Sequence, residues 1–178
     1  MSNNGGGMMK TILVTGPIGG GKSEVCRYLA SKGFPVYDSD SRAKALYDSV
    51  PGLLERIENE LGVSRGDFGI IFSDDGKRLA LENILYPAVR DDMLSWKASL
   101  PESGTAFIES AVAGEKPVFD GVYDGIWFID CPLETRAARN PKVRERNGAQ
   151  QFGHSRGDVI ILNDKTIEDL HKKIEDLL

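Results

Sequence analysis

Short apolar runs alternate along this chain with longer stretches in which apolar residues recur at helical spacing. Such runs, rich in β-branched and aromatic residues, occur five times. The alternation predicts an α/β fold, namely a five-stranded parallel sheet with helices on both faces. We expect the strand at 11–15 to be central. The expected strands are residues 11–15, 34–37, 105–109, 125–131 and 158–163.

The interval between the second and third expected strands is too long for a simple crossover. Residues 42–100 contain amphipathic helical stretches at 51–61 and from 73 to about 100, and Pro87 is expected to kink or split the second. We interpret the interval as a helical insertion that binds a substrate. The residues expected to face inward are Leu53, Leu54, Ile57, Leu61, Leu79, Ile84, Leu85, Val89, Met93 and Trp96.

Residues 16–23 read G-x-x-x-x-G-K-S, the pattern of a phosphate-binding loop. An expected strand precedes the pattern and a helical stretch follows it, as the motif requires. Glycines let backbone N–H groups approach phosphate oxygens, and the helix start favours an anion. We expect Lys22 to reach the β- and γ-phosphates and the Ser23 hydroxyl to ligate Mg²⁺. The residues predicted to bind ATP are Gly16, Pro17, Ile18, Gly19, Gly20, Gly21, Lys22, Ser23, Glu24 and Asn163.

Carboxylates stand at the ends of two expected strands. Asp38 and Asp40 follow the second strand, and Glu109 ends the third. Because the sites of α/β sheets gather at the carboxyl ends of strands, these residues are candidates for metal binding or base chemistry. The alternatives are a helix N-cap for one of the aspartates and a surface carboxylate for Glu109.

A basic segment at about 134–150 follows the fourth expected strand. It carries more arginine and lysine than acid, which favours a lid over ATP phosphates, with a solvated helix face as the alternative. The sequence does not rank Arg136, Arg139 and Arg144, and we place Arg139 with Lys22 and Asp40 in the candidate catalytic set.

The fifth expected strand ends at Asn163, whose amide we expect to meet an adenine edge. Thr166 is expected to cap the last helix. The buried stripe of that helix is expected to comprise Ile167, Leu170, Ile174 and Leu177.

Composition and charge exclude several classes of binding partner. The 178 residues carry a net charge of −5, which argues against broad electrostatic binding of nucleic acid. No apolar run approaches membrane-spanning length, and Cys26 and Cys131 show no metal or disulfide spacing. We expect a cytoplasmic protein with reduced thiols, no nucleic-acid or membrane partner, a flexible leader at 1–9 and one domain at 10–178.

From Lys10 onward the chain resembles the dephospho-coenzyme A kinases. The resemblance implies that ATP and Mg²⁺ are used to phosphorylate the ribose 3′-hydroxyl of dephospho-coenzyme A, the last step of coenzyme A synthesis. It also places Asp40 beside the acceptor hydroxyl. The matching pieces are residues 15–23, 35–40, 71–74, 84–87, 108–111 and 158–163.

The sequence departs from that family in four places. Tyr86 replaces a usual His, Lys44 replaces a common Arg, the stretch before Ile71 is short, and the lid is compressed. Two alternatives therefore stay open: a related kinase with another acceptor, and a nucleotide-binding protein that has lost catalysis. The candidate substrate-binding residues are Asp38, Asp40, Lys44, Tyr86 and Glu109.

Overall fold

The computed structural model describes residues 8–147 and 157–178 and separates into two compact units. One unit, here the sheet unit, comprises Met1–Asp38 and Ser99–Leu178, and the other, the helical unit, comprises Ser39–Ala98. The helical unit corresponds closely to the insertion expected at 42–100. Among the described residues, no helix has the length and apolar character needed to cross a bilayer.

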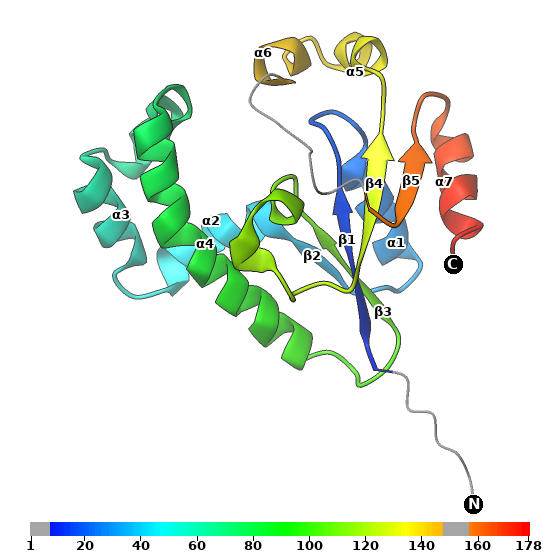
Figure 1. The fold of residues 1–178 in the computed structure, drawn as a ribbon, viewed down its shortest axis with the longest axis horizontal. Coiled ribbons are helices and arrows are strands. Elements are labelled where there is room, and N and C mark those ends of the chain that lie inside the picture. The colour runs from blue at the N-terminus through cyan, green and yellow to red at the C-terminus, as the bar shows by residue number, and fades with distance from the viewer. Residues whose placement is uncertain (1–7, 148–156) are drawn as a thin grey trace, which may run out of the picture. The chain divides into compact units, whose positions relative to one another are not determined.

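The sheet unit is built on five parallel strands in the order β2-β3-β1-β4-β5, so β1 is central as predicted (Figure 1). Because every connection is a crossover, the carboxyl ends of all strands lie at one edge of the sheet. The strands are β1 (Lys10–Thr15), β2 (Val36–Asp38), β3 (Thr105–Glu109), β4 (Gly125–Asp130) and β5 (Val159–Leu162).

One face of the sheet packs against α1 (Lys22–Ser31) and α7 (Ile167–Glu175). Val25 and Leu29 of α1 are fully buried, and so is Ile174 of α7, in one cluster with side chains from the strands. This cluster removes Val25, Leu29, Leu170 and Ile174 from water, and it holds the start of α1 at the end of β1. The short 3₁₀ turn η2 (Ala113–Glu115) contacts β1. A second 3₁₀ turn, η3 (Pro117–Phe119), follows it in the chain.

The expected stripe of the last helix is only partly buried. Thr166 caps α7 by accepting a hydrogen bond from the Asp169 N–H, and Leu170 is buried with Ile174. Ile167 and Leu177, however, are exposed. Ile167 is the first helical residue, with no preceding turn to hold it, and Leu177 lies beyond the end of the helix, so it does not follow the helical spacing.

The helical unit contains α2 (Ser39–Ser49), α3 (Leu53–Leu61), the 3₁₀ segment η1 (Arg65–Ser73) and α4 (Asp75–Ala98). Ile57, Ile71 and Met93 form part of its core. Arg42 on α2 donates two hydrogen bonds of 2.9 Å to the Asp92 carboxylate on α4, which fixes the two helices to each other.

The helix α4 continues through Pro87 as one element, so the split that was one of the two outcomes expected there does not occur. A proline deprives the carbonyl four residues earlier of its partner; here that residue, Asn83, is exposed, so water can satisfy its carbonyl. Leu79 is 57% exposed instead of facing inward, and Leu54 and Trp96 are only half-buried.

Candidate functional site

The loop between β1 and α1 adopts a tight curve that its glycines permit. Gly16 has φ = 144° and Gly21 has φ = 106°, values at which a side chain is strained. A Cβ atom at Gly16 would stand 2.4 Å from the carbonyl oxygen of Ile129. The loop therefore passes too close to the end of β4 for any larger residue.

Side-chain donors hold the carbonyl groups of this loop. Lys22 Nζ donates to the oxygens of Gly16 at 2.7 Å and Pro17 at 3.0 Å. Asn163 Nδ2 donates to the Gly20 oxygen at 2.8 Å. These hydrogen bonds hold the shape of the loop, which leads into α1, whose N-cap residue, Gly21, supplies no side-chain cap. Such a helix start suits an anion.

Acidic side chains stand beside the loop at the carboxyl edge of the sheet. Val14 of β1 is in register with Glu109 of β3, and Glu109 is in register with Asp38 of β2. The Ser23 hydroxyl donates to Glu109 Oε1 at 2.8 Å. The sheet unit therefore brings Ser23, Glu109 and Asp38 together, as the sequence led us to expect for strand ends.

The pKa of the buried Cys26 thiol depends on the charged side chains around it. Burial raises the pKa of Cys26 well above its ordinary value, the negative charges of Glu109 and Asp38 raise it further, and Lys22 lowers it. Burial likewise raises the pKa of Cys131. Both cysteines are free and buried.

Two residues that we assigned to ATP have protein partners in this structure. Glu24 pairs with Arg27 and, at 3.0 Å, with His171 Nε2 on α7. His171 in turn stacks on Tyr28 with ring centroids 3.9 Å apart. Glu24 therefore joins α1 to α7, and Asn163 braces the loop. Their contacts with nucleotide stay predictions.

The basic segment forms α5 (Leu133–Arg139) and α6 (Val143–Asn147), which follow the carboxyl end of β4 (Figure 1). Part of the expected lid, residues 148–150, lies outside the described residues. The segment's arginines have different surroundings. Arg136 is buried and contacts the loop, Arg139 donates to the Lys165 oxygen at 3.2 Å, and Arg144 pairs with Glu134 at 2.7 Å.

In the helical unit, Asp40 lies in the first turn of α2 and Tyr86 on α4. The Tyr86 hydroxyl donates to Glu82 Oε1 at 3.5 Å. Burial raises the pKa of Tyr86 far above its ordinary value, and the negative charges of Glu82 and Asp40 add to the effect. Two residues singled out by the family resemblance, Asp40 and Tyr86, therefore lie near each other, while Lys44 is exposed on α2.

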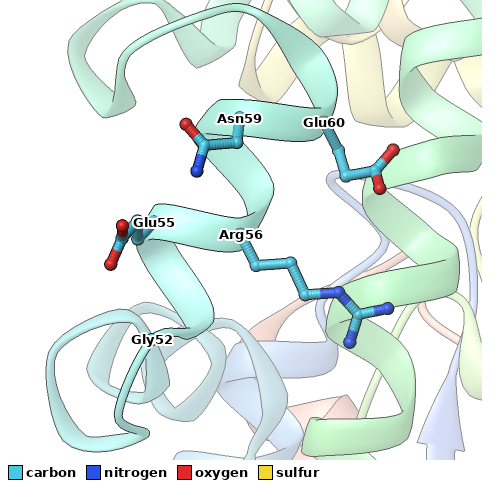
Figure 2. Close-up of a pocket in the computed structure, with 5 residues that line it drawn as sticks. All are labelled: Gly52, Glu55, Arg56, Asn59 and Glu60. Carbon is cyan, nitrogen blue, oxygen red and sulfur yellow. The ribbon is translucent and has the colours of Figure 1, made fainter.

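A recess in the helical unit contains none of these residues. It measures about 510 Å³ and lies along α3, lined by Gly52, Glu55, Arg56, Asn59 and Glu60. Figure 2 shows that its side chains diverge, with Glu55 and Arg56 pointing to opposite sides of the helix. The polar groups do not converge on a ligand position, so we do not assign the recess to the site.

Substitution of Gly16 is expected to destabilise the loop. Gly16→Ala places a methyl group against backbone at a strained φ, and we expect a loss of about 3 kcal/mol of folding free energy. The check is chemical denaturation, with Gly66→Ala as control, because a Cβ at Gly66 meets nothing within 4 Å. Equal stability of the two variants would contradict the packing described for Gly16.

Comparison with known proteins gives a consistent result. A sequence model described as dephospho-CoA kinase matches residues 10–169. The dephospho-CoA kinase of Porphyromonas gingivalis is 36% identical over 140 residues, 74% of this chain and 68% of that protein. A dephospho-CoA kinase of Thermus thermophilus is 30% identical over 183 residues, 94% of this chain and 89% of that protein.

Solved structures agree with the sequence matches. A crystal structure of a Thermus thermophilus protein superposes with a TM-score of 0.75 at 28% identity, covering 96% of both chains. Shikimate kinase from Aquifex aeolicus shares the fold, with a TM-score of 0.51 at 19% identity and coverage of 94% of both chains. The phosphate-loop kinase architecture predicted from the sequence is therefore confirmed.

Proposed function

We propose, since this chain belongs to the dephospho-CoA kinase family, that it transfers the γ-phosphoryl group of ATP to the ribose 3′-hydroxyl of dephospho-coenzyme A. The observation that carries the proposal is the braced loop between β1 and α1, with Ser23 bonded to Glu109 beside it. A loop held in shape before binding needs little reorganisation when phosphates arrive, which is the condition for electrostatic catalysis.

Mg²⁺ suits the oxygen ligands found here. Among the described residues, no group of three or more His, Cys, Asp or Glu side chains gathers to hold a metal by itself. The ion would instead be held by the Ser23 hydroxyl and nucleotide phosphates, with the Glu109 carboxylate accepting from Ser23 or from a bound water. When bound, Mg²⁺ neutralises charge on the phosphates.

Lys22 changes partners in this proposal. Its ammonium group donates to the Gly16 and Pro17 oxygens in the free protein. We propose that these bonds give way to bonds with the β- and γ-phosphate oxygens when ATP binds. An ammonium group binds a charged phosphate more strongly than a neutral carbonyl, so the exchange of these two bonds favours the phosphates.

Asp40 is proposed to orient the acceptor hydroxyl and accept its proton. Carboxylates are in general weak bases at neutral pH. Phosphoryl transfer nevertheless has a loose transition state, so the nucleophile loses its proton late, and orientation is the larger contribution. The neighbouring Tyr86 hydroxyl stays protonated because its pKa is raised, and in this structure it donates to Glu82.

The proposal is tested by a substrate panel. ATP consumption is measured with dephospho-coenzyme A, with nucleoside monophosphates and with small hydroxy acids as acceptors. Turnover with dephospho-coenzyme A alone supports the proposal. Preference for another acceptor would indicate a related kinase, and tight ATP binding without turnover would indicate a protein that has lost catalysis. The cytoplasmic location and the lack of a nucleic-acid partner stay predictions.

The acceptor is expected to bind the helical unit without help from ATP. Dephospho-coenzyme A alone should slow amide hydrogen exchange in α2 and α4, which carry Asp40 and Tyr86. The measurement is exchange at saturating ligand, with ATP alone as the matched comparison. An unchanged pattern over residues 42–100 would contradict the assignment of this unit to the acceptor.

A further inference from the structure

Arg136 is a buried cation that the transfer described above does not use. Its side chain lies on α5 and the residue is 6% exposed, whereas Arg139 and Arg144 are exposed. Burial of a guanidinium is unfavourable unless hydrogen bonds replace its hydration, so a buried arginine calls for specific partners. Those partners show what this one does.

The guanidinium of Arg136 joins the end of β4 to the loop. Its Nε donates to the Cys131 oxygen at 2.9 Å, and its Nη1 donates to the Ile18 oxygen at 3.1 Å. Ile18 is a residue of the loop itself. The planar group therefore fixes one loop carbonyl relative to the sheet, and it brings a full positive charge next to the proposed phosphate site.

A second contact from the same segment reaches the adjacent loop residue. Val143 of α6 is fully buried, and its Cγ2 lies 2.8 Å from the position that a Cβ atom on Gly19 would take. Arg136 and Val143 thus attach the α5–α6 segment to two consecutive loop residues, Ile18 and Gly19. Together with Asn163 on the Gly20 oxygen, they hold three successive residues of the loop.

We propose that Arg136 is a positioning residue, which sets the shape of the loop and adds charge beside it without touching the transferring phosphoryl group. The inference rests on the proposed ATP site. The arginines of the basic segment then have different roles. If one of them acts on the transition state, it is an arginine other than Arg136. It also predicts that loop and segment respond to nucleotide together.

An arginine that positions the loop and one that stabilises the transition state differ in their effect on ADP affinity. An arginine that stabilises the transferring group acts on turnover and leaves ADP affinity unchanged, since ADP lacks that group. A positioning residue acts on the whole loop, so its loss weakens ADP and ATP alike. The ratio of the two affinities therefore separates the roles without any acceptor present.

The experiment compares Arg136→Gln, which removes the charge, with Arg136→Lys, which keeps it. Calorimetry with Mg²⁺ should show ADP and ATP affinities falling by the same factor, about 10- to 100-fold in Arg136→Gln, the scale for a hydrogen bond from a charged group. The loss should be smaller in Arg136→Lys, and turnover at saturating ATP should fall less than affinity does. Lys172→Gln, which removes one exposed charge from α7, is the control. Unchanged ADP affinity in Arg136→Gln would overturn the proposal.

A measurement on the parent protein covers the case in which these variants fail to fold. With isotope-labelled arginine, the Arg136 Nε–H should exchange slowly with water both before and after Mg²⁺–ADP is added, because its acceptor is the Cys131 oxygen. Rapid exchange in the free protein would overturn the proposal. Failure of the parent to bind nucleotide would instead contradict the proposed function, and the exchange rate would still test the contact.

Discussion

Lys22→Ala is expected to lower turnover by about 100-fold or more while the fold stays intact, the scale for loss of one preorganised electrostatic partner. The Gly16 and Pro17 oxygens hold the Lys22 ammonium group at the loop, beside the position proposed for the phosphates. Its side chain is half-buried at the start of α1, so truncation removes little core packing. Steady-state turnover and the thermal midpoint are measured on the same preparation.

The control for Lys22→Ala is Lys172→Ala, which removes a lysine from the exposed surface of the same unit. It should retain parental turnover. Normal turnover in Lys22→Ala would contradict the assignment of the loop to phosphoryl transfer. A large fall in thermal midpoint would show that the bonds to Gly16 and Pro17 stabilise the fold as well.

Asp40→Asn is expected to lose about 10²- to 10⁴-fold in turnover, with ATP affinity within a few-fold of the parent. The substitution keeps the size of the side chain and removes both the charge and the ability to take a proton. Its position on α2, near Tyr86, is in the helical unit rather than in the loop that we propose binds phosphates. ATP affinity by calorimetry and steady-state turnover together test this separation.

Asp38→Asn is the matched comparison. Asp38 ends β2 and is in register with Glu109, so its carboxylate lies near the proposed Mg²⁺ site. We expect this variant to need more Mg²⁺ and to lose less turnover than Asp40→Asn. Full turnover in Asp40→Asn together with a loss in Asp38→Asn would exchange the two assignments, and full turnover in both would place the chemistry elsewhere.

Local patterns predicted the elements well because each depends on neighbours in sequence. The strand at Thr105–Glu109 has the expected bounds, and the loop follows β1 as its motif requires. Strand order depends on contacts distant in sequence. The sequence therefore did not reveal that β3 lies between β1 and β2, which brings Glu109, rather than the aspartates, next to Ser23.

The sequence did not reveal which side chains donate hydrogen bonds to the carbonyl groups of the loop. Arg136 was one of several similar arginines in a basic segment, and no spacing rule marks which one turns inward. The sequence predicts that the Asn163 amide meets adenine, and it did not reveal that the amide nitrogen bonds to the Gly20 oxygen. One signal was present: a polar residue directly after an apolar strand, Leu162 before Asn163, lies at the edge where the loop also lies.

The most direct test of the central claim follows the transferred group itself. ATP with ¹⁸O in its γ-phosphoryl group is incubated with the protein, Mg²⁺ and dephospho-coenzyme A, and the products are analysed by mass spectrometry and ³¹P NMR. The account predicts labelled coenzyme A with the new phosphate on the ribose 3′-oxygen, and ADP in equal amount. Label found only in inorganic phosphate, or on another position of the acceptor, would contradict it.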